Sequence, residues 1–208
     1  MRIIVFGDSI SEGMWDYEAG GWVNRLKLDY WNEYKYEKLV YNYGVSAYTT
    51  EHVLKIFKNS FDALCNRDAS SEKEAVIIFA IGINDTATNF STRENLVTQD
   101  KFSQNIQSLI DMCQKEKLIK NVIFISAINI DESKTNRDIS RWGNNSYFND
   151  TISEYNTLLE NLALESTCGY IDIFGMMNQD DFEDGLHPNA QGHKKMYQKI
   201  KQCLEEKI

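Results

Sequence analysis

Five short apolar segments, each followed by a stretch with helical periodicity, constrain most strongly what this chain can fold into. The segments are Ile3–Phe6, Leu39–Tyr43, Ala75–Ile81, Val122–Ala127 and Tyr170–Ile173. Continuous apolar runs without polar alternation are typical of parallel strands that are covered on both faces. The stretches between them carry helical stripes, for example Val53, Ile56, Phe57, Phe61 and Leu64.

Strands that alternate with helices predict right-handed βαβ units. We therefore expect an α/β fold of three layers, with a doubly wound, five-stranded parallel sheet of flavodoxin-like order 2-1-3-4-5 between two layers of helices. No linker or repeat divides the chain, so residues 1–208 are expected to form one domain.

Composition excludes some partners. The chain is 42% hydrophobic and 25% charged, which is ordinary for a globular protein, and its net charge is −9. Nucleic acids and anionic membranes reward clustered Lys and Arg, so neither is an expected partner. The first apolar run is too short for a signal peptide, no segment could span a membrane, and the four cysteines are widely spaced. These features predict free thiols and a cytoplasmic location.

Ser9 ends the first predicted strand, within Gly7-Asp8-Ser9. A serine there reaches the carboxyl edge of the sheet, where open α/β sheets bind their ligands. Near the other end of the chain, Asp184 precedes His187 by three residues in a polar turn. This spacing can bring a carboxylate beside the imidazole Nδ1 and leave Nε2 free for a serine. The alternative is an aspartate that only shapes the loop.

The other two histidines are weaker candidates for a general base. His52 opens a predicted helix, and His193 lies one turn into the last helix, where packing or a surface position is expected. Two residues that follow other strands are also candidates. Asn84 either caps a turn or donates its amide to a developing oxyanion, and Gly44 either ends a strand or lets a backbone N–H approach a ligand closely.

Four ordered motifs resemble the GDSL, or SGNH, family of serine esterases and lipases. They are Gly7-Asp8-Ser9-Ile10, Asn42-Tyr43-Gly44-Val45-Ser46-Ala47, Gly82-Ile83-Asn84-Asp85, and Asp184 with His187-Pro188. Isoleucine replaces the leucine of the family name, and Ala47 stands where glycine is common. No Gly-x-Ser-x-Gly is present, so the nucleophile elbow of the α/β-hydrolases is absent.

The resemblance implies an esterase that forms an acyl-enzyme on Ser9, with His187 as general base and Asp184 as the group that orients it. It also implies an oxyanion hole made by the backbone N–H groups of Ser9 and Gly44 and the side-chain amide of Asn84. The expected substrate is a small-molecule acyl ester, with short acyl or acetyl groups favoured, and no cofactor or metal is expected.

Other functions stay open at this point. A lysophospholipase or thioesterase would use the same residues. A metal-dependent phosphoesterase would use Asp8, Asn84, Asp85, Asp184 and His187 as ligands, although such sites usually contain several histidines. A binding module without catalysis is the third alternative. The long irregular stretch 129–150, with Arg137, Arg141 and Trp142, is typical of a functional or mobile loop.

Overall fold

The computed structural model describes residues 1–35, 37–65, 73–135 and 145–206. Its main sheet has five parallel strands in the order β2-β1-β3-β5-β7. The strands are β1 (Arg2–Gly7), β2 (Leu39–Gly44), β3 (Ala75–Ala80), β5 (Ile119–Ile125) and β7 (Gly169–Ile171). In chain order these are strands 2-1-3-4-5 of the sheet, so the predicted fold class and strand order are confirmed.

The last two strands of this sheet end earlier than predicted. β5 stops at Ile125 rather than residue 127, and β7 stops at Ile171 rather than residue 173. Side chains take over the backbone groups that would continue the pairing. The Ala127 N–H donates to Asn156 Oδ1 at 2.8 Å, and the Ile173 N–H donates to Ser126 Oγ at 2.8 Å.

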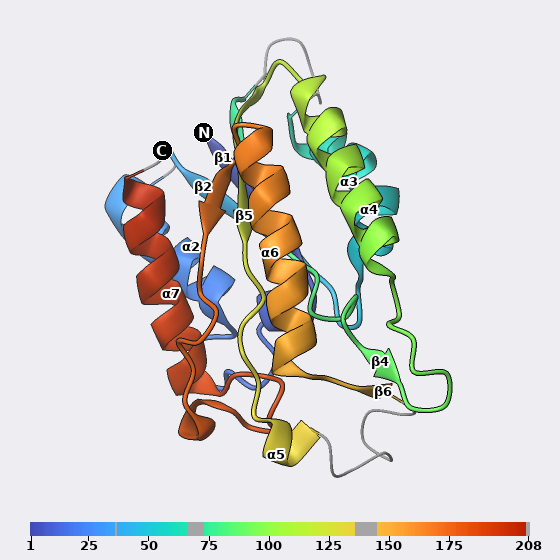
Figure 1. The fold of residues 1–208 in the computed structure, drawn as a ribbon. Coiled ribbons are helices and arrows are strands. Elements are labelled where there is room, and N and C mark those ends of the chain that lie inside the picture. The colour runs from blue at the N-terminus through green and yellow to red at the C-terminus, as the bar shows by residue number, and fades with distance from the viewer. Residues whose placement is uncertain (36, 66–72, 136–144, 207–208) are drawn as a thin grey trace.

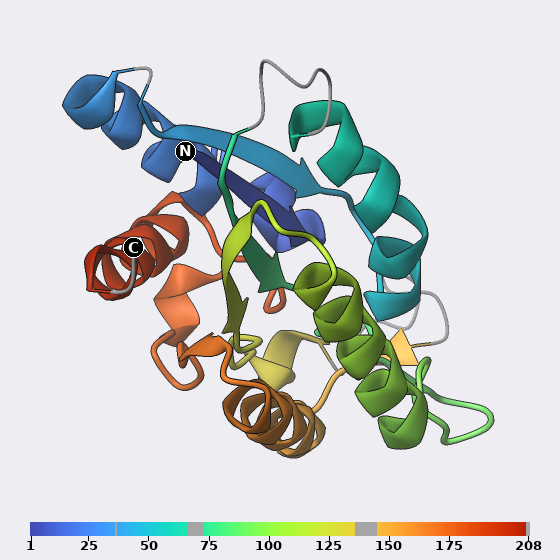
Figure 2. The ribbon, with the colours of Figure 1, turned by 90° about the horizontal axis from the view of Figure 1, so that it is seen from above.

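Helices cover both faces of the sheet, which makes three layers (Figures 1 and 2). One face packs against α2 (Trp22–Tyr34) and α7 (Ala190–Glu205), and the other against α3 (Thr50–Cys65), α4 (Gln99–Gln114) and α6 (Asn149–Glu165). Three shorter helices, α1 (Ser9–Glu12), α5 (Glu132–Thr135) and the 3-10 turn Gln179–Asp181, lie in the connections. None of the helices in the described part of the chain is long and apolar enough to cross a membrane.

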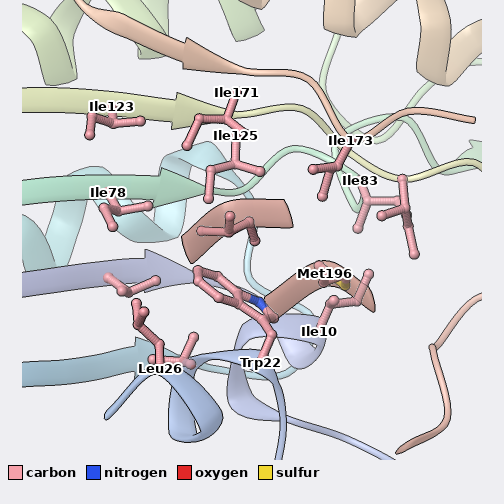
Figure 3. Close-up of a cluster of buried hydrophobic side chains, with 14 of the residues drawn as sticks. Ile10, Trp22, Leu26, Ile78, Ile83, Ile123, Ile125, Ile171, Ile173 and Met196 are labelled. Carbon is pink, nitrogen blue, oxygen red and sulfur yellow. The ribbon is translucent and has the colours of Figure 1, made fainter. Parts of the chain in front are cut away.

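Alternate residues of each central strand enter different cores. Ile3 and Val5 of β1 face the α2 and α7 side, whereas Ile4 and Phe6 face the α3, α4 and α6 side, and all four are fully buried. Figure 3 shows part of the first core, in which Ile10, Ile83, Trp22 and Met196 gather beyond the ends of the strands. Because Ile10 follows Ser9 and Ile83 precedes Asn84, this core anchors the backbone beside both residues.

A second, two-stranded antiparallel sheet was not predicted. It pairs β4 (Thr88–Asn89) with β6 (Asn145–Ser146), with Thr88 opposite Ser146 and Asn89 opposite Asn145. Strands this short carry no hydrophobic periodicity that a sequence could reveal. β6 and α5 belong to the 129–150 stretch, whose predicted functional residues Arg137, Arg141 and Trp142 lie outside the described residues.

Candidate active site

The residues singled out from the sequence meet at the carboxyl edge of the three neighbouring strands β2, β1 and β3. Gly7, the last residue of β1, pairs with Gly44 of β2 and Ala80 of β3. The segments that follow these three residues, with Ser9 and Asn84 among them, therefore leave the sheet side by side. This edge is the switch point at which the strand order reverses.

Ser9 begins α1, and Asp8 caps that helix by accepting a hydrogen bond from the Ile10 N–H at 2.9 Å. Burial raises the pKa of Asp8 to about 6, against the lowering effects of this bond and of the His187 charge. The Ser9 side chain is aimed at His187, because its Oγ lies 2.9 Å from His187 Nε2. Ser9 is 5% exposed and His187 is 6% exposed.

Asp184 binds the opposite side of the His187 ring. Its Oδ2 lies 2.9 Å from Nδ1, and its Oδ1 accepts the backbone N–H groups of Leu186 at 3.0 Å and His187 at 2.8 Å. The turn requires glycine at 185, where φ is 95° and a Cβ would lie 3.0 Å from the Asp131 carbonyl oxygen. The structure thus brings Ser9, His187 and Asp184 into one hydrogen-bonded row.

The charge on Asp184 is strongly favoured. Burial acts to raise its pKa, but hydrogen bonds from the His187 ring and from the backbone of His187 and Leu186 lower the pKa to about 2. The carboxylate is therefore ionised at neutral pH. An ionised Asp184 accepts a hydrogen from Nδ1 and leaves Nε2 of His187 as an acceptor for the Ser9 hydroxyl.

Trp15 is a partner of Asp184 that the sequence reading missed. Its indole Nε1 donates to Asp184 Oδ2 at 2.9 Å, so this oxygen accepts hydrogens from both Trp15 and His187. The Trp15 backbone has a φ of 68°, which is uncommon for a residue with a side chain. Nothing in the spacing of the sequence joins residue 15 to residue 184.

The loop that carries Trp15 is held on both sides. Asp16 accepts hydrogen bonds from the backbone N–H groups of Glu18, Ala19 and Gly21, and its carboxylate pairs with Arg25 at 2.8 Å. His193 is fully buried behind the loop. Its Nδ1 accepts the Trp22 N–H at 3.3 Å, so its Nε2 donates to the Met14 carbonyl at 3.0 Å. Of the two roles predicted for His193, packing or a surface position, the structure shows packing.

Asn84 lies at the same edge, and both ends of its amide are engaged. Its Nδ2 donates one hydrogen to the Tyr48 carbonyl at 3.0 Å, and its Oδ1 accepts the Tyr147 hydroxyl at 3.2 Å. Its neighbour Asp85 holds the start of α3, because both of its oxygens accept the Thr50 N–H at 3.1–3.2 Å. Burial raises the pKa of Asp85 to about 7, although the bonds from Thr50 act to lower it.

The structure differs from the prediction for Gly44. The Gly44 N–H donates to Asn42 Oδ1 at 2.8 Å, so it is not directed at a ligand beside Ser9. Glycine is needed there for another reason, because a Cβ would lie 2.3 Å from the Glu12 backbone nitrogen of α1. Three residues later, Ala47 has a φ of 63°, and its N–H has no acceptor among the residues that the structure describes.

His52 is held by two residues of the segment that follows β2. Its Nδ1 contacts Thr49 Oγ1 at 2.9 Å, and its ring stacks on Tyr48 with centroids 5.0 Å apart. Within residues 1–35, 37–65, 73–135 and 145–206, no three His, Cys, Asp or Glu side chains are grouped so that they could hold a metal ion.

Solved structures of similar fold include a lipase/acylhydrolase and an acetylxylan esterase. A lipase/acylhydrolase from Enterococcus faecalis is 26% identical, with a TM-score of 0.65, and the match covers 97% of this chain and 93% of that one. A mutant of the acetylxylan esterase Axe2 from Geobacillus stearothermophilus is 17% identical, with a TM-score of 0.70, and the match covers 98% and 93% of the two chains.

Sequence comparison specifies the family. Residues 5–195 match the model of the GDSL-like Lipase/Acylhydrolase family. A GDSL esterase/lipase from Arabidopsis thaliana, CPRD49, is 23% identical over 212 residues, which cover 99% of this chain and 79% of the relative. The chain therefore belongs to the GDSL-like lipase/acylhydrolase family, and it is an enzyme of the esterase/acylhydrolase type.

Proposed function

We propose that this enzyme hydrolyses carboxylic esters through an acyl-enzyme on Ser9, with His187 and Asp184 completing a catalytic triad. One observation carries the proposal: Ser9 Oγ lies 2.9 Å from His187 Nε2, and His187 Nδ1 lies 2.9 Å from Asp184 Oδ2. A serine hydroxyl is a weak nucleophile unless an adjacent base takes its proton, and a base oriented by a third group is the usual arrangement.

The reaction would run in two halves. Ser9 Oγ attacks the ester carbonyl carbon while its proton moves to His187 Nε2, and Asp184 stabilises the charged imidazole. Collapse of the tetrahedral intermediate breaks the bond to the alcohol, which leaves with the proton from His187. Water then attacks the acyl-enzyme with His187 again as base, and the carboxylic acid and free Ser9 are released.

The oxyanion of the intermediate needs donors on the side of Ser9 opposite His187. We assign two predicted donors, the Ser9 N–H and the second hydrogen of Asn84 Nδ2, whose first hydrogen binds the Tyr48 carbonyl. For the third we replace Gly44, whose N–H is engaged by Asn42, with Ala47. Ala47 precedes Tyr48 and so lies next to the carbonyl that holds Asn84. Loss of one such donor typically lowers turnover by roughly 10²–10³.

We infer that the favoured substrates carry short acyl groups, acetyl in particular. Acetyl groups are what the acetylxylan esterase of similar fold removes, by its name. Lysophospholipids and acyl thioesters are the alternative substrates. A cytoplasmic location of the enzyme remains a prediction from the sequence.

The experiment is a comparison of four proteins on p-nitrophenyl acetate. Wild type should turn over, Ser9→Ala and His187→Ala should each lose nearly all activity, and Ser108→Ala, on the exposed surface of α4, should keep it. A fluorophosphonate should label wild type and not Ser9→Ala. An inert wild type, or a Ser9→Ala protein with full activity, would contradict the proposal. Acyl chains of increasing length, acetylated sugars and thioesters would then rank the substrates.

A further inference from the structure

Tyr147 is a buried residue outside all four motifs that contacts one of them. Its hydroxyl donates to Asn84 Oδ1 at 3.2 Å, and the residue is 6% exposed. Burial, with the nearby charges of Asp8 and Asp184, raises the pKa of Tyr147 to about 12. The hydroxyl therefore stays protonated over the whole pH range in which an esterase would be assayed, and it keeps its hydrogen to donate.

The contact matters because a carboxamide has two different ends. In the observed orientation, Asn84 Nδ2 faces the Tyr48 carbonyl and Oδ1 faces the Tyr147 hydroxyl. If the amide were reversed, Oδ1 would face the Tyr48 carbonyl and two acceptors would oppose each other. With both partners in place, one Nδ2 hydrogen binds Tyr48 and the other is held in a fixed direction.

The small second sheet explains how Tyr147 reaches Asn84. Tyr147 follows β6 directly, and β6 pairs antiparallel with β4 at residues 88 and 89. Asn84 precedes β4 in a tight turn, in which the Ala87 N–H donates to the Asn84 carbonyl at 3.2 Å. Because the two strands run in opposite directions, the residue after β6 lies beside the turn before β4. This arrangement gives the two-residue strands a positioning role at the site.

We propose that Tyr147 is a positioning residue for the oxyanion hole, which acts by fixing the amide orientation of Asn84. The inference rests on the proposed function of Asn84 as a donor to the oxyanion. Tyr147 would not touch the substrate. Its effect would therefore appear in turnover and would depend entirely on the presence of the Asn84 side chain.

The test is a double-mutant cycle on p-nitrophenyl acetate with Tyr147→Phe and Asn84→Ala. A neutral hydrogen bond contributes about 0.5–1.5 kcal/mol, so Tyr147→Phe should lower kcat roughly two- to tenfold while KM stays close to its wild-type value. Asn84→Ala should lower kcat by roughly 10²–10³. In the Asn84→Ala background, Tyr147→Phe should have no further effect on kcat, because the amide that it orients is absent.

Tyr155→Phe is the matched control. The Tyr155 hydroxyl is also buried, donates to the Val97 carbonyl at 2.5 Å and accepts from Asn95 Nδ2 at 3.1 Å. Loss of the Tyr155 hydroxyl should lower the melting temperature about as much as loss of the Tyr147 hydroxyl does, but it should not lower kcat. If Tyr147→Phe proves too unstable to assay, the same cycle is run with Tyr147→His, whose ring N–H can donate to Asn84 and should preserve part of the coupling.

Two results would overturn the inference. In one, Tyr147→Phe keeps wild-type kcat although Asn84→Ala has lost its activity. In the other, Tyr147→Phe lowers kcat by the same factor with and without the Asn84 side chain, which would indicate a general structural effect. Both differ from failure of the proposed function, in which Ser9→Ala would stay active or the wild type would be inert.

Discussion

Asp184→Asn removes a charge and keeps the size of the side chain, so it tests the row of hydrogen bonds that ends at Ser9. The carboxylate accepts four N–H donors in the structure. Oδ1 accepts the two backbone donors, and Oδ2 accepts Trp15 Nε1 and His187 Nδ1. An asparagine oxygen can replace Oδ1, but the amide nitrogen then faces the two ring donors.

The two rings respond differently to that amide nitrogen. The Trp15 indole can only donate, so its part-buried N–H loses its partner; full burial of an unpaired N–H costs about 1–3 kcal/mol of unfolding free energy, which sets the upper range here. His187 can instead move its proton from Nδ1 to Nε2 and accept from the new amide. The proton on Nε2 then faces Ser9, so His187 is no longer a base for it. Turnover should fall roughly 10⁴-fold, the magnitude known for the wrong tautomer in other serine hydrolases.

The assay is initial-rate hydrolysis of p-nitrophenyl acetate together with urea unfolding of the same samples. The matched control is Asp180→Asn, an exposed aspartate four residues away in the same connection between β7 and α7, which should change neither property. An Asp184→Asn protein that keeps more than roughly a tenth of wild-type turnover would refute the tautomer argument. An unchanged free energy of unfolding would refute the argument that the Trp15 N–H loses its acceptor.

The other predictions concern residues around the site. Trp15→Phe keeps an aromatic side chain but removes the indole N–H that donates to an ionised Asp184, so urea unfolding should show a loss of about 1.5–3 kcal/mol and turnover should fall less than in Asp184→Asn. Ala47→Gly should raise the unfolding free energy by up to about 1 kcal/mol with activity retained, because it relieves a positive φ of 63° and keeps the N–H. Burial lowers the pKa of His193 below its usual 6.5, so the unfolded chain binds the extra proton. As pH falls below 6.5, the free energy of unfolding of wild type should therefore decrease by up to about 1.4 kcal/mol per pH unit relative to that of His193→Gln. Urea unfolding of both proteins at several pH values measures this difference.

The sheet was predictable because its strands are buried on both faces. Ile3 to Phe6 and Ala75 to Phe79 are almost completely inaccessible, and such strands leave continuous apolar runs in the sequence. The predicted ends of β5 and β7 were each wrong by two residues. They depend on Ser126 and Asn156, whose side chains bind backbone groups beyond the strands, and an apolar run does not record such bonds.

Glycine at position 44 shows where sequence reasoning about the site stops. A glycine after a strand indicates a close approach, and the structure has one, but the approaching group is the backbone of α1 rather than a ligand. Which backbone N–H is left without an acceptor depends on the Asn42 side chain, two residues away. The sequence could locate the loop that follows β2, but it could not say which of its amides faces Ser9.

Trp15 and Tyr147 escaped the sequence reading for a common reason. Each contacts a motif residue at a hydrogen-bonding position that the proposed chemistry leaves free. Trp15 donates to a second lone pair of Asp184 Oδ2, the oxygen that also accepts His187 Nδ1, and Tyr147 donates to Asn84 Oδ1. These contacts span 169 and 63 residues of sequence and come from loops without periodicity. A chain could therefore keep all four motifs, lose either ring, and retain the reaction at a reduced rate. Motifs identify the groups that react, whereas the residues that hold those groups in one orientation have to be read from the fold.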